Sequence, residues 1–451
     1  MARAKENAMK KWEEMTWQEK REERFKRWLS PKNVKFVSRE AEKLYKARVT
    51  RFIKAIKMEE PDRVPCILPM GYFPAYYAGV TFRTIMYDYA ELKRSWLKFI
   101  HDFKDADSVN GPALVMPGRI LDGLDIKNMK WPGHGLGEEA WYYQFIEGEY
   151  MKADEYDRLI RDPSDYTFRV NLPRTAGIFA SFDKLPPLRS LQGNRLGLVP
   201  ALADPDIRRA FQKMIDLGKE YQKWQAVVTE VSQTALAEGL PNMRGGMAGA
   251  PFDTLADMLR GTQGISVDMF RQPEKIIAYV EAITPQMIEQ TIQMADNLDC
   301  PVISMPLHKG DDVFMSDKQF EKFYWPTYRK MLLAMINEGL VPFPFAEGKY
   351  NNRLKQITDM PKSGVVWYFD QTDMKEAKRT LGNVSCIIGN VPSSIIVTGT
   401  KQLVKESCRK LIEDCGPGGG YILSGGAGID KCPPENLRVM MEAVEEYGRY
   451  K

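Results

Sequence analysis

The chain has 451 residues, 44% of them hydrophobic and 27% charged, and a formal net charge of +4. This even charge balance argues against nucleic acid or an anionic membrane as a partner. No stretch reaches the roughly 18–20 apolar residues of a membrane span. The six scattered cysteines form no CxxC pair, and the N-terminus lacks the apolar core of a signal peptide, so we expect a cytoplasmic protein.

The first segment, residues 1–60, is dense in Lys, Arg and Glu with aromatic residues between them. This pattern predicts a helical N-terminal extension whose aromatic stripe packs on the body of the protein. A partner-docking or dimerisation arm is the alternative, and it leaves a homodimer open.

From Arg63 onward, short apolar runs alternate with helical stretches. The runs include "RVPCILPM" (63–70), "DCPVISMPLH" (299–308), "LVPFPFAE" (340–347), "GVVWYFD" (364–370), "VSCIIGN" (384–390) and "GGYILSGG" (419–426). Continuous apolar strands that alternate with helices are typical of a parallel sheet buried on both faces. With the glycine-rich turn and helix at 242–261 and a run near 107–112, we count about eight units, which predicts an α/β fold, a TIM (β/α)8 barrel over 61–451.

Residues 113–240 interrupt this alternation. We expect them to form an insertion of loops and helices over the mouth of the barrel, the end where the strands' carboxyl termini lie. Catalytic groups of such barrels come from that end.

Three titratable side chains end neighbouring strand runs: His308, Glu347 and Asp370. One imidazole and two carboxylates at the mouth can transfer protons or, through His308 and Glu347, bind a divalent metal. Each of the three also has a structural interpretation. A lone histidine such as His308 is often structural, Asp370 could cap a helix, and Glu347 could cap the next helix or pair with Lys349 or Arg353. We assign substrate contacts to six further residues: Met70, Tyr72, Tyr76, Asn110, Arg244 and Asn390.

The C-terminal stretch "GPGGGYILSGGAGIDKCPPENLRVMMEAVEEYG" (416–448) resembles the ending of the uroporphyrinogen decarboxylase superfamily. The segments "GAPFDTLADMLRG" (249–261) and "MSDKQFEKFYWPTYRKM" (315–331) are also similar to it. The resemblance covers roughly residues 60–448 and implies a TIM barrel. It further implies either a cofactor-free tetrapyrrole decarboxylase or a methyltransferase that works with a corrinoid protein.

The sequence departs from both branches. Where the thiol-activating methyltransferases bind zinc through His-x-Cys and a later Cys, this chain has Phe345, Glu347 and Ala427. Where the decarboxylases have an Arg-rich "RQAGRY"-like motif for substrate carboxylates, it has "PMGYFPAYY" (69–77). These departures argue against thiol activation and against decarboxylation of uroporphyrinogen itself.

We expect a corrinoid-dependent methyltransferase that demethylates a small O-methyl (or N- or S-methyl) donor. The chain lacks a DxHxxG-like cobalamin signature, so the corrinoid would be carried by a separate partner protein. Zn²⁺ is a candidate cofactor despite the missing cysteine ligands. Two alternatives stay open: a cofactor-free decarboxylase or lyase on a smaller substrate, and a non-catalytic barrel that binds a tetrapyrrole or corrinoid.

Overall fold

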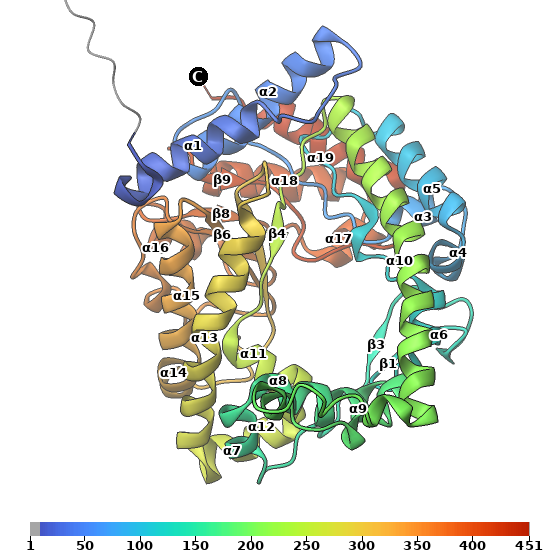
Figure 1. Ribbon diagram of the computed structural model, residues 1–451. Helices are drawn as coiled ribbons and strands as arrows, with labels where there is room; N and C mark the ends of the chain where they lie inside the picture. The colour runs from blue at the N-terminus through green and yellow to red at the C-terminus, as the bar shows by residue number, and fades with distance from the viewer. Residues whose placement is uncertain (1–9, 451) are drawn as a thin grey trace, which may run out of the picture.

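The computed structural model describes residues 10–450, so residues 1–9 of the predicted extension and Lys451 lie outside the description. Its central element is a sheet of six parallel strands in the order β4-β5-β6-β7-β8-β9 (Figure 1). Each strand follows its neighbour in the chain after a crossover connection, as parallel strands require. The crossovers contain α-helices except between β6 and β7, where residues 347–365 form only the 3-10 turn Gln356–Thr358. The strands are β4 (Gly246–Met247), β5 (Val302–Leu307), β6 (Val341–Ala346), β7 (Val366–Phe369), β8 (Cys386–Ile388) and β9 (Tyr421–Ile422).

Two extended segments complete the ring. Residues 63–70 run beside the last strand, with parallel bridges from Cys66 to Leu423 and from Met70 to Ile429. Residues 107–110 reach the other edge, where the Val109 N–H donates to the Pro241 carbonyl at 3.2 Å, just before β4. The predicted TIM barrel is confirmed, with these two positions occupied by segments without a regular ladder.

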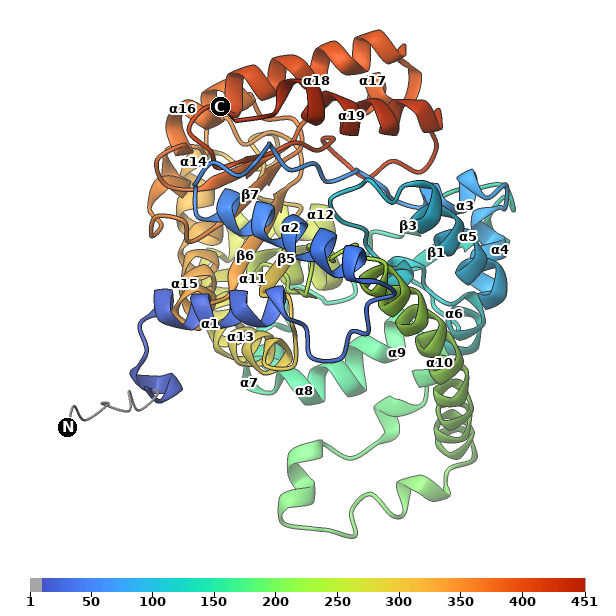
Figure 2. The ribbon, with the colours of Figure 1, turned by 90° about the horizontal axis from the view of Figure 1, so that it is seen from above.

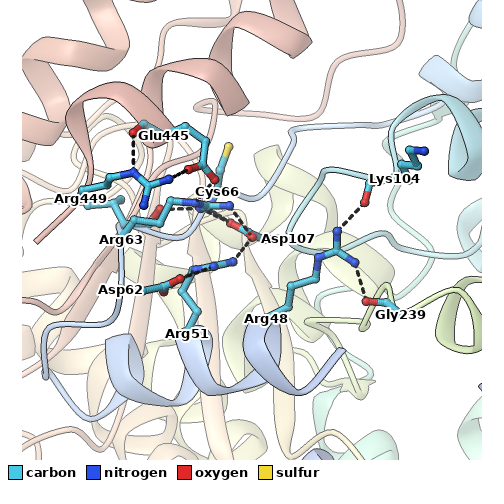
Figure 3. Close-up of polar contacts among 11 residues, drawn as sticks. Arg48, Arg51, Asp62, Arg63, Cys66, Lys104, Asp107, Gly239, Glu445 and Arg449 are labelled. Carbon is cyan, nitrogen blue, oxygen red and sulfur yellow. Dashed lines mark hydrogen bonds and ion pairs between the residues drawn. The ribbon is translucent and has the colours of Figure 1, made fainter. Parts of the chain in front are cut away.

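A buried carboxylate joins the two segments (Figure 3). Asp107 accepts hydrogen bonds from the Cys66 N–H at 2.8 Å and from the Arg63 guanidinium at 2.7 and 2.9 Å. Arg51, from the N-terminal helix α2, donates to the same carboxylate. Burial alone would raise the pKa of Asp107, but the two arginines lower it below its ordinary value. The side chain of Asp107 thus links residues 63–70 to residues 107–110, where no regular backbone ladder does so.

Helices α1 (Trp17–Leu29) and α2 (Arg39–Ile56) cover the N-terminal end of the barrel, at the top of Figure 1. Their aromatic stripe, including Phe25 and Trp28, is buried against the first residues of the strands, such as Val302 and Val341. Arg21 donates to backbone carbonyls of the barrel, including that of Leu340. The two helices therefore share one core with the strands, and no packing boundary falls at residue 60.

The outer layer holds the crossover helices and the helices that follow the sheet. The long helix α10 (Pro205–Ala237) packs along α5. The other helices are α5 (Tyr89–Asp102), α11 (Pro251–Leu255), α12 (Gly261–Arg271), α13 (Pro273–Ala295), α14 (Asp317–Gln319), α15 (Trp325–Asn337), α16 (Met374–Leu381), α17 (Ser393–Thr398), α18 (Lys401–Cys415) and α19 (Pro434–Tyr447). Within residues 10–450, no helix combines the length and apolar character needed to cross a bilayer.

Residues 113–204 carry the irregular part of the chain. The Met151 N–H donates to the Leu259 carbonyl at 2.8 Å, so this part reaches the helices that follow β4. Residues 177–204 instead extend away from the barrel, in green in Figure 2. Residues 113–240 were expected to form an insertion over the mouth. Two parts of this segment do not lie there: the loop 177–204 points outward, and α10 belongs to the outer layer. The short elements are α3 (Phe73–Tyr77), α4 (Phe82–Tyr87), α6 (Gly118–Leu124), β1 (Met129–Pro132), β2 (Gly135–Leu136), β3 (Gln144–Phe145), α7 (Tyr156–Arg161), α8 (Pro163–Tyr166) and α9 (Leu172–Thr175).

Candidate active site

Strand alternation decides which side chains face the interior of the barrel, here called the bore. In β6, Val341 and Phe343 belong to the buried cluster inside the ring, and Phe345 packs against it. Successive side chains of a strand point to opposite faces, so Glu347, two residues further, continues the bore-facing series. The same reasoning places three other strand-end residues on that side: His308 after β5, Asp370 after β7 and Asn390 after β8.

His308 and Glu347 meet at the mouth. His308 Nε2 lies 3.8 Å from Glu347 Oε2, and the two side chains are 43% and 55% exposed. The other ring nitrogen, Nδ1, is 2.6 Å from Asp257 Oδ2. Asp257 lies in a π-helical turn, Ala256–Arg260, that follows α11. Asp257 thus holds the imidazole of His308 through Nδ1. The second nitrogen, Nε2, faces solvent and the carboxylate of Glu347.

The carboxylates favour the charged imidazole. The hydrogen bond to Asp257 is the largest cause that raises the pKa of His308 above 6.5, and Asp253 and Glu347 act in the same direction. Desolvation raises the pKa of Glu347, while His308 lowers it and Asp370 raises it. The surrounding carboxylates therefore favour the protonated form of His308 more than water does, and Glu347 lies between that imidazole and solvent.

A fully buried carboxylate fixes the turn that carries His308. Asp253 accepts the backbone N–H of His308 at 3.0 Å and that of Lys309 at 3.1 Å, together with the Tyr324 hydroxyl at 2.8 Å. Burial and the neighbouring Asp257 raise the pKa of Asp253 to about 6. Sequence reasoning missed Asp253 and Asp257, although both lie in "GAPFDTLADMLRG", one helical turn apart just after the end of a barrel strand.

Lys309 also contacts this group. Its Nζ lies 3.5 Å from Asp257 Oδ1 and 3.5 Å from Glu147 Oε1, and it donates to Thr262 Oγ1 at 2.7 Å. Glu147 belongs to the segment after β3, so the lysine ties residues 113–204 to the mouth. This residue, too, was not singled out in the sequence.

Asp370 lies beside the pair without contacting His308. Its Oδ2 accepts the Gly348 N–H at 3.1 Å, and Gly348 has φ of 81°, a conformation that glycine adopts readily. Asn390 Nδ2 donates to the carbonyls of Asp370 and Thr372 at 3.0 and 2.8 Å. Both residues therefore order the loop that presents Glu347.

The residues expected to contact substrate occupy separate parts of the ring. Met70 and Tyr72 lie beside the last strand, where the Tyr72 N–H donates to Asp430 at 2.8 Å. Tyr76 is 40% exposed and packs edge-on against Trp141 at 6.0 Å. Asn110 has a buried side-chain oxygen without a hydrogen-bond partner. None of the four has a side-chain hydrogen bond or ion pair to His308 or Glu347.

Arg244 lies in the lower part of the bore. Its guanidinium carbon is 6.0 Å from the centroid of the Phe343 ring, and it is close enough to Tyr368 to influence the pKa of that phenol. Burial lowers the pKa of Arg244. Among residues 10–450 the guanidinium has no carboxylate partner and donates no hydrogen bond.

The donor set does not fit a resident metal. In the part of the chain that the structure describes, no group of three or more His, Cys, Asp or Glu side chains is arranged to hold an ion. His308 Nδ1 is already bonded to Asp257, which leaves Nε2 and Glu347 as a pair.

The family model of uroporphyrinogen decarboxylase (URO-D) matches residues 191–447, more than half of the chain. The chain belongs to the uroporphyrinogen decarboxylase family. Uroporphyrinogen decarboxylase from Neisseria meningitidis serogroup C / serotype 2a is 22% identical over 263 residues, which cover 54% of this chain and 72% of that protein. The enzyme from Syntrophotalea carbinolica is 22% identical over 205 residues, which cover 44% and 58%.

Among solved structures, a methyltransferase from Methanosarcina mazei superposes with a TM-score of 0.55 at 16% sequence identity. The superposition covers 88% of this chain and 98% of the methyltransferase. At this identity the likeness shows the fold. The uroporphyrinogen decarboxylase family thus includes this barrel, and the choice of reaction depends on the side chains at its mouth.

Proposed function

We propose that this member of the uroporphyrinogen decarboxylase family is a corrinoid-dependent methyltransferase. It demethylates an O-methyl donor, or less favourably an N- or S-methyl donor, and passes the methyl group to the cobalt of a separate corrinoid protein. The observation that carries the proposal is the Asp257–His308–Glu347 arrangement, with His308 Nδ1 2.6 Å from Asp257 and Nε2 3.8 Å from Glu347. The structural likeness to a methyltransferase supports it.

The chemistry needs an acid at the oxygen of the donor. When a Co(I) nucleophile takes the methyl group, the electron pair of the C–O bond stays on oxygen. Protonated His308 donates its Nε2 proton to that oxygen, so the products are an alcohol or phenol and a methylated cobalt. General acid catalysis of this kind contributes about 10²- to 10⁴-fold. Asp257 stabilises the imidazolium, and Glu347 returns a proton to His308 from water.

Oxygen is the leaving atom that suits this site best. Activation of a thiolate acceptor would need a zinc ion held by soft ligands such as cysteine. The positions of those zinc ligands are occupied here by Phe345, Glu347 and Ala427. Phe345 packs its ring 4.8 Å from that of Tyr368. An aromatic wall beside a proton donor fits a methyl ether.

The decisive experiment mixes the protein with a Co(I) corrinoid protein and a panel of methyl ethers, methylamines and thioethers. Absorbance then follows loss of Co(I) and formation of methyl-Co(III). We expect methyl transfer from at least one ether. No spectral change with any donor, together with binding of the corrinoid protein, would favour a non-catalytic corrinoid-binding barrel.

A cofactor-free decarboxylase is the second candidate, because the relatives from Neisseria and Syntrophotalea are named uroporphyrinogen decarboxylases. The loop that follows residue 70 offers no arginine for a substrate with many carboxylates. A smaller carboxylic acid would remain a substrate for such an enzyme. Release of CO₂ without a corrinoid protein would support this reaction and count against methyl transfer.

A further inference from the structure

Residues 147–151, from the irregular part of the chain, are bonded to the segment that follows α11. Arg260 donates a hydrogen bond to Glu149 at 2.6 Å, and the Thr262 hydroxyl donates one to Glu147. These contacts hold the carboxylate of Glu147 at the edge of the candidate active site, although it comes from neither a barrel strand nor the turn after one.

Lys309 lies between two carboxylates. Its Nζ is 3.5 Å from Asp257 Oδ1 and also 3.5 Å from Glu147 Oε1. The ammonium group donates its short hydrogen bond to Thr262 Oγ1, at 2.7 Å, so neither carboxylate is at the distance of a charge-assisted hydrogen bond. The Lys309 side chain is only 15% exposed, so salt and water screen these charges less than they screen charges on the surface.

Asp257 is the carboxylate that holds His308. It uses Oδ2 for the imidazole, at 2.6 Å from Nδ1, and presents Oδ1 to Lys309. A cation that moved closer to Oδ1 would neutralise more of the carboxylate charge and weaken its hydrogen bond to the imidazole. The charge of Glu147 opposes that movement, because it attracts the same ammonium group.

We propose that Glu147 is a positioning residue of the active site, which acts through Lys309 and keeps the charge of Asp257 available to His308. Among residues 10–450, Glu147 has no hydrogen bond or ion pair with His308 itself. Glu147 also precedes residues 191–447, which match the family model. The matched region alone therefore does not contain every group that controls the site. Only the measurements of turnover below rest on the proposed function.

The first test needs no methyl donor. The chain has three histidines, so protein labelled with ¹⁵N-histidine gives three imidazole spectra, and the His308→Gln variant identifies that of His308. We expect Glu147→Gln to shift the ¹⁵N resonance of His308 Nδ1, which reports its hydrogen bond to Asp257. In a Lys309→Met background the same substitution should cause no shift. No shift in either background, or an equal shift in both, overturns the proposal.

The second test is a double-mutant cycle on methyl transfer. Glu147→Gln should lower kcat/KM by about 3- to 30-fold in the otherwise wild-type protein, the scale of coupling within one network. The loss should disappear in the Lys309→Met background. Equal losses in both backgrounds would mean that Glu147 only holds its own segment in place, and would overturn the proposal.

Glu149→Gln is the matched control. Glu149 lies two residues from Glu147, is similarly exposed (55% against 61%) and pairs with Arg260 rather than with Lys309. Any effect of Glu149→Gln should therefore be the same in both backgrounds. Lys309→Gln, which keeps a polar group for Thr262, gives a second neutral background in case Lys309→Met does not fold.

The outcome for Glu147 is separable from the outcome for the reaction. If the Nδ1 resonance depends on Glu147 only when Lys309 is present, but no donor methylates cobalt, methyl transfer fails and the positioning role stands. If methyl transfer occurs and the effects of the two substitutions are additive, the role of Glu147 fails and the methyltransferase stands.

Discussion

Asp257 and His308 are held 2.6 Å apart, between Oδ2 and Nδ1, although 51 residues separate them in the chain. Because the hydrogen bond uses Nδ1, the remaining nitrogen, Nε2, is the one that faces Glu347 and the mouth. The carboxylate both orients the ring and stabilises its protonated form. The ring can therefore act as an acid above the pH at which a free histidine would lose its proton.

Asp257→Asn should shift the pH dependence of the reaction. The amide oxygen can still accept from Nδ1–H, but the negative charge that raises the pKa of His308 is gone. Since protonated His308 is the active form, activity falls as pH rises through its pKa, and in the variant this fall moves to lower pH. The measurement is kcat/KM for methyl transfer from pH 5 to 9, with Asp359→Asn as surface control. An alkaline limb at the wild-type position would rule out this role of Asp257.

Glu347→Gln should reduce turnover by about 10²-fold or more while changing the melting temperature little. The side chain is 55% exposed, so its replacement by an amide of the same shape costs little packing. The loss arises because Gln cannot return a proton to His308. Glu281→Gln, on an exposed position of α13, is the matched control. Near-wild-type turnover in Glu347→Gln would refute a chemical role for this residue.

Asp107→Asn should destabilise the fold by about 3–5 kcal/mol, the usual cost of removing one partner from a buried ion pair. It leaves Arg51 and Arg63 without their shared carboxylate and removes the link between the first two barrel segments. Urea unfolding at pH 7 measures the difference, and the exposed Asp105→Asn provides a nearby control. A loss below about 1 kcal/mol would contradict the closing role of Asp107.

The contribution of Asp107 to the free energy of unfolding should depend on pH in a defined direction. The pKa of Asp107 is below its ordinary 3.8 in the folded protein, so its contribution is complete above that pH and is lost as pH falls through the lowered pKa. The stability gap between wild type and Asp107→Asn should accordingly be constant from pH 7 to 5 and narrow below about pH 4. A gap that stays constant at lower pH would mean that folding does not lower the pKa of Asp107.

Elemental analysis of protein purified without chelator should find far less than one equivalent of zinc. His308 and Glu347 face each other as a pair, and residues 10–450 supply no third donor in position. Treatment with EDTA should leave methyl transfer unchanged. One tightly held zinc per chain, removed together with activity, would show that the side chains rearrange to bind metal.

The alternation of apolar runs and helices was enough to predict the barrel, and the ends of those runs placed His308 and Glu347 on it. Both features depend on local rules, namely strand length and the period of two that keeps side chains on one face. For the same reason Asp370 and Asn390 were found, although they order a loop and do not contact His308.

Only the tertiary structure decided which distant groups meet. Asp257 reaches His308 because the turn after β4 folds over the end of β5, and Asp107 joins Arg51 and Arg63 because three segments converge at the floor of the barrel. The sequence predicted that the aromatic stripe of the N-terminal helices packs on the body, but only the structure shows that it covers the N-terminal end of the barrel. Such contacts depend on the packing of segments far apart in the chain, which no local period encodes.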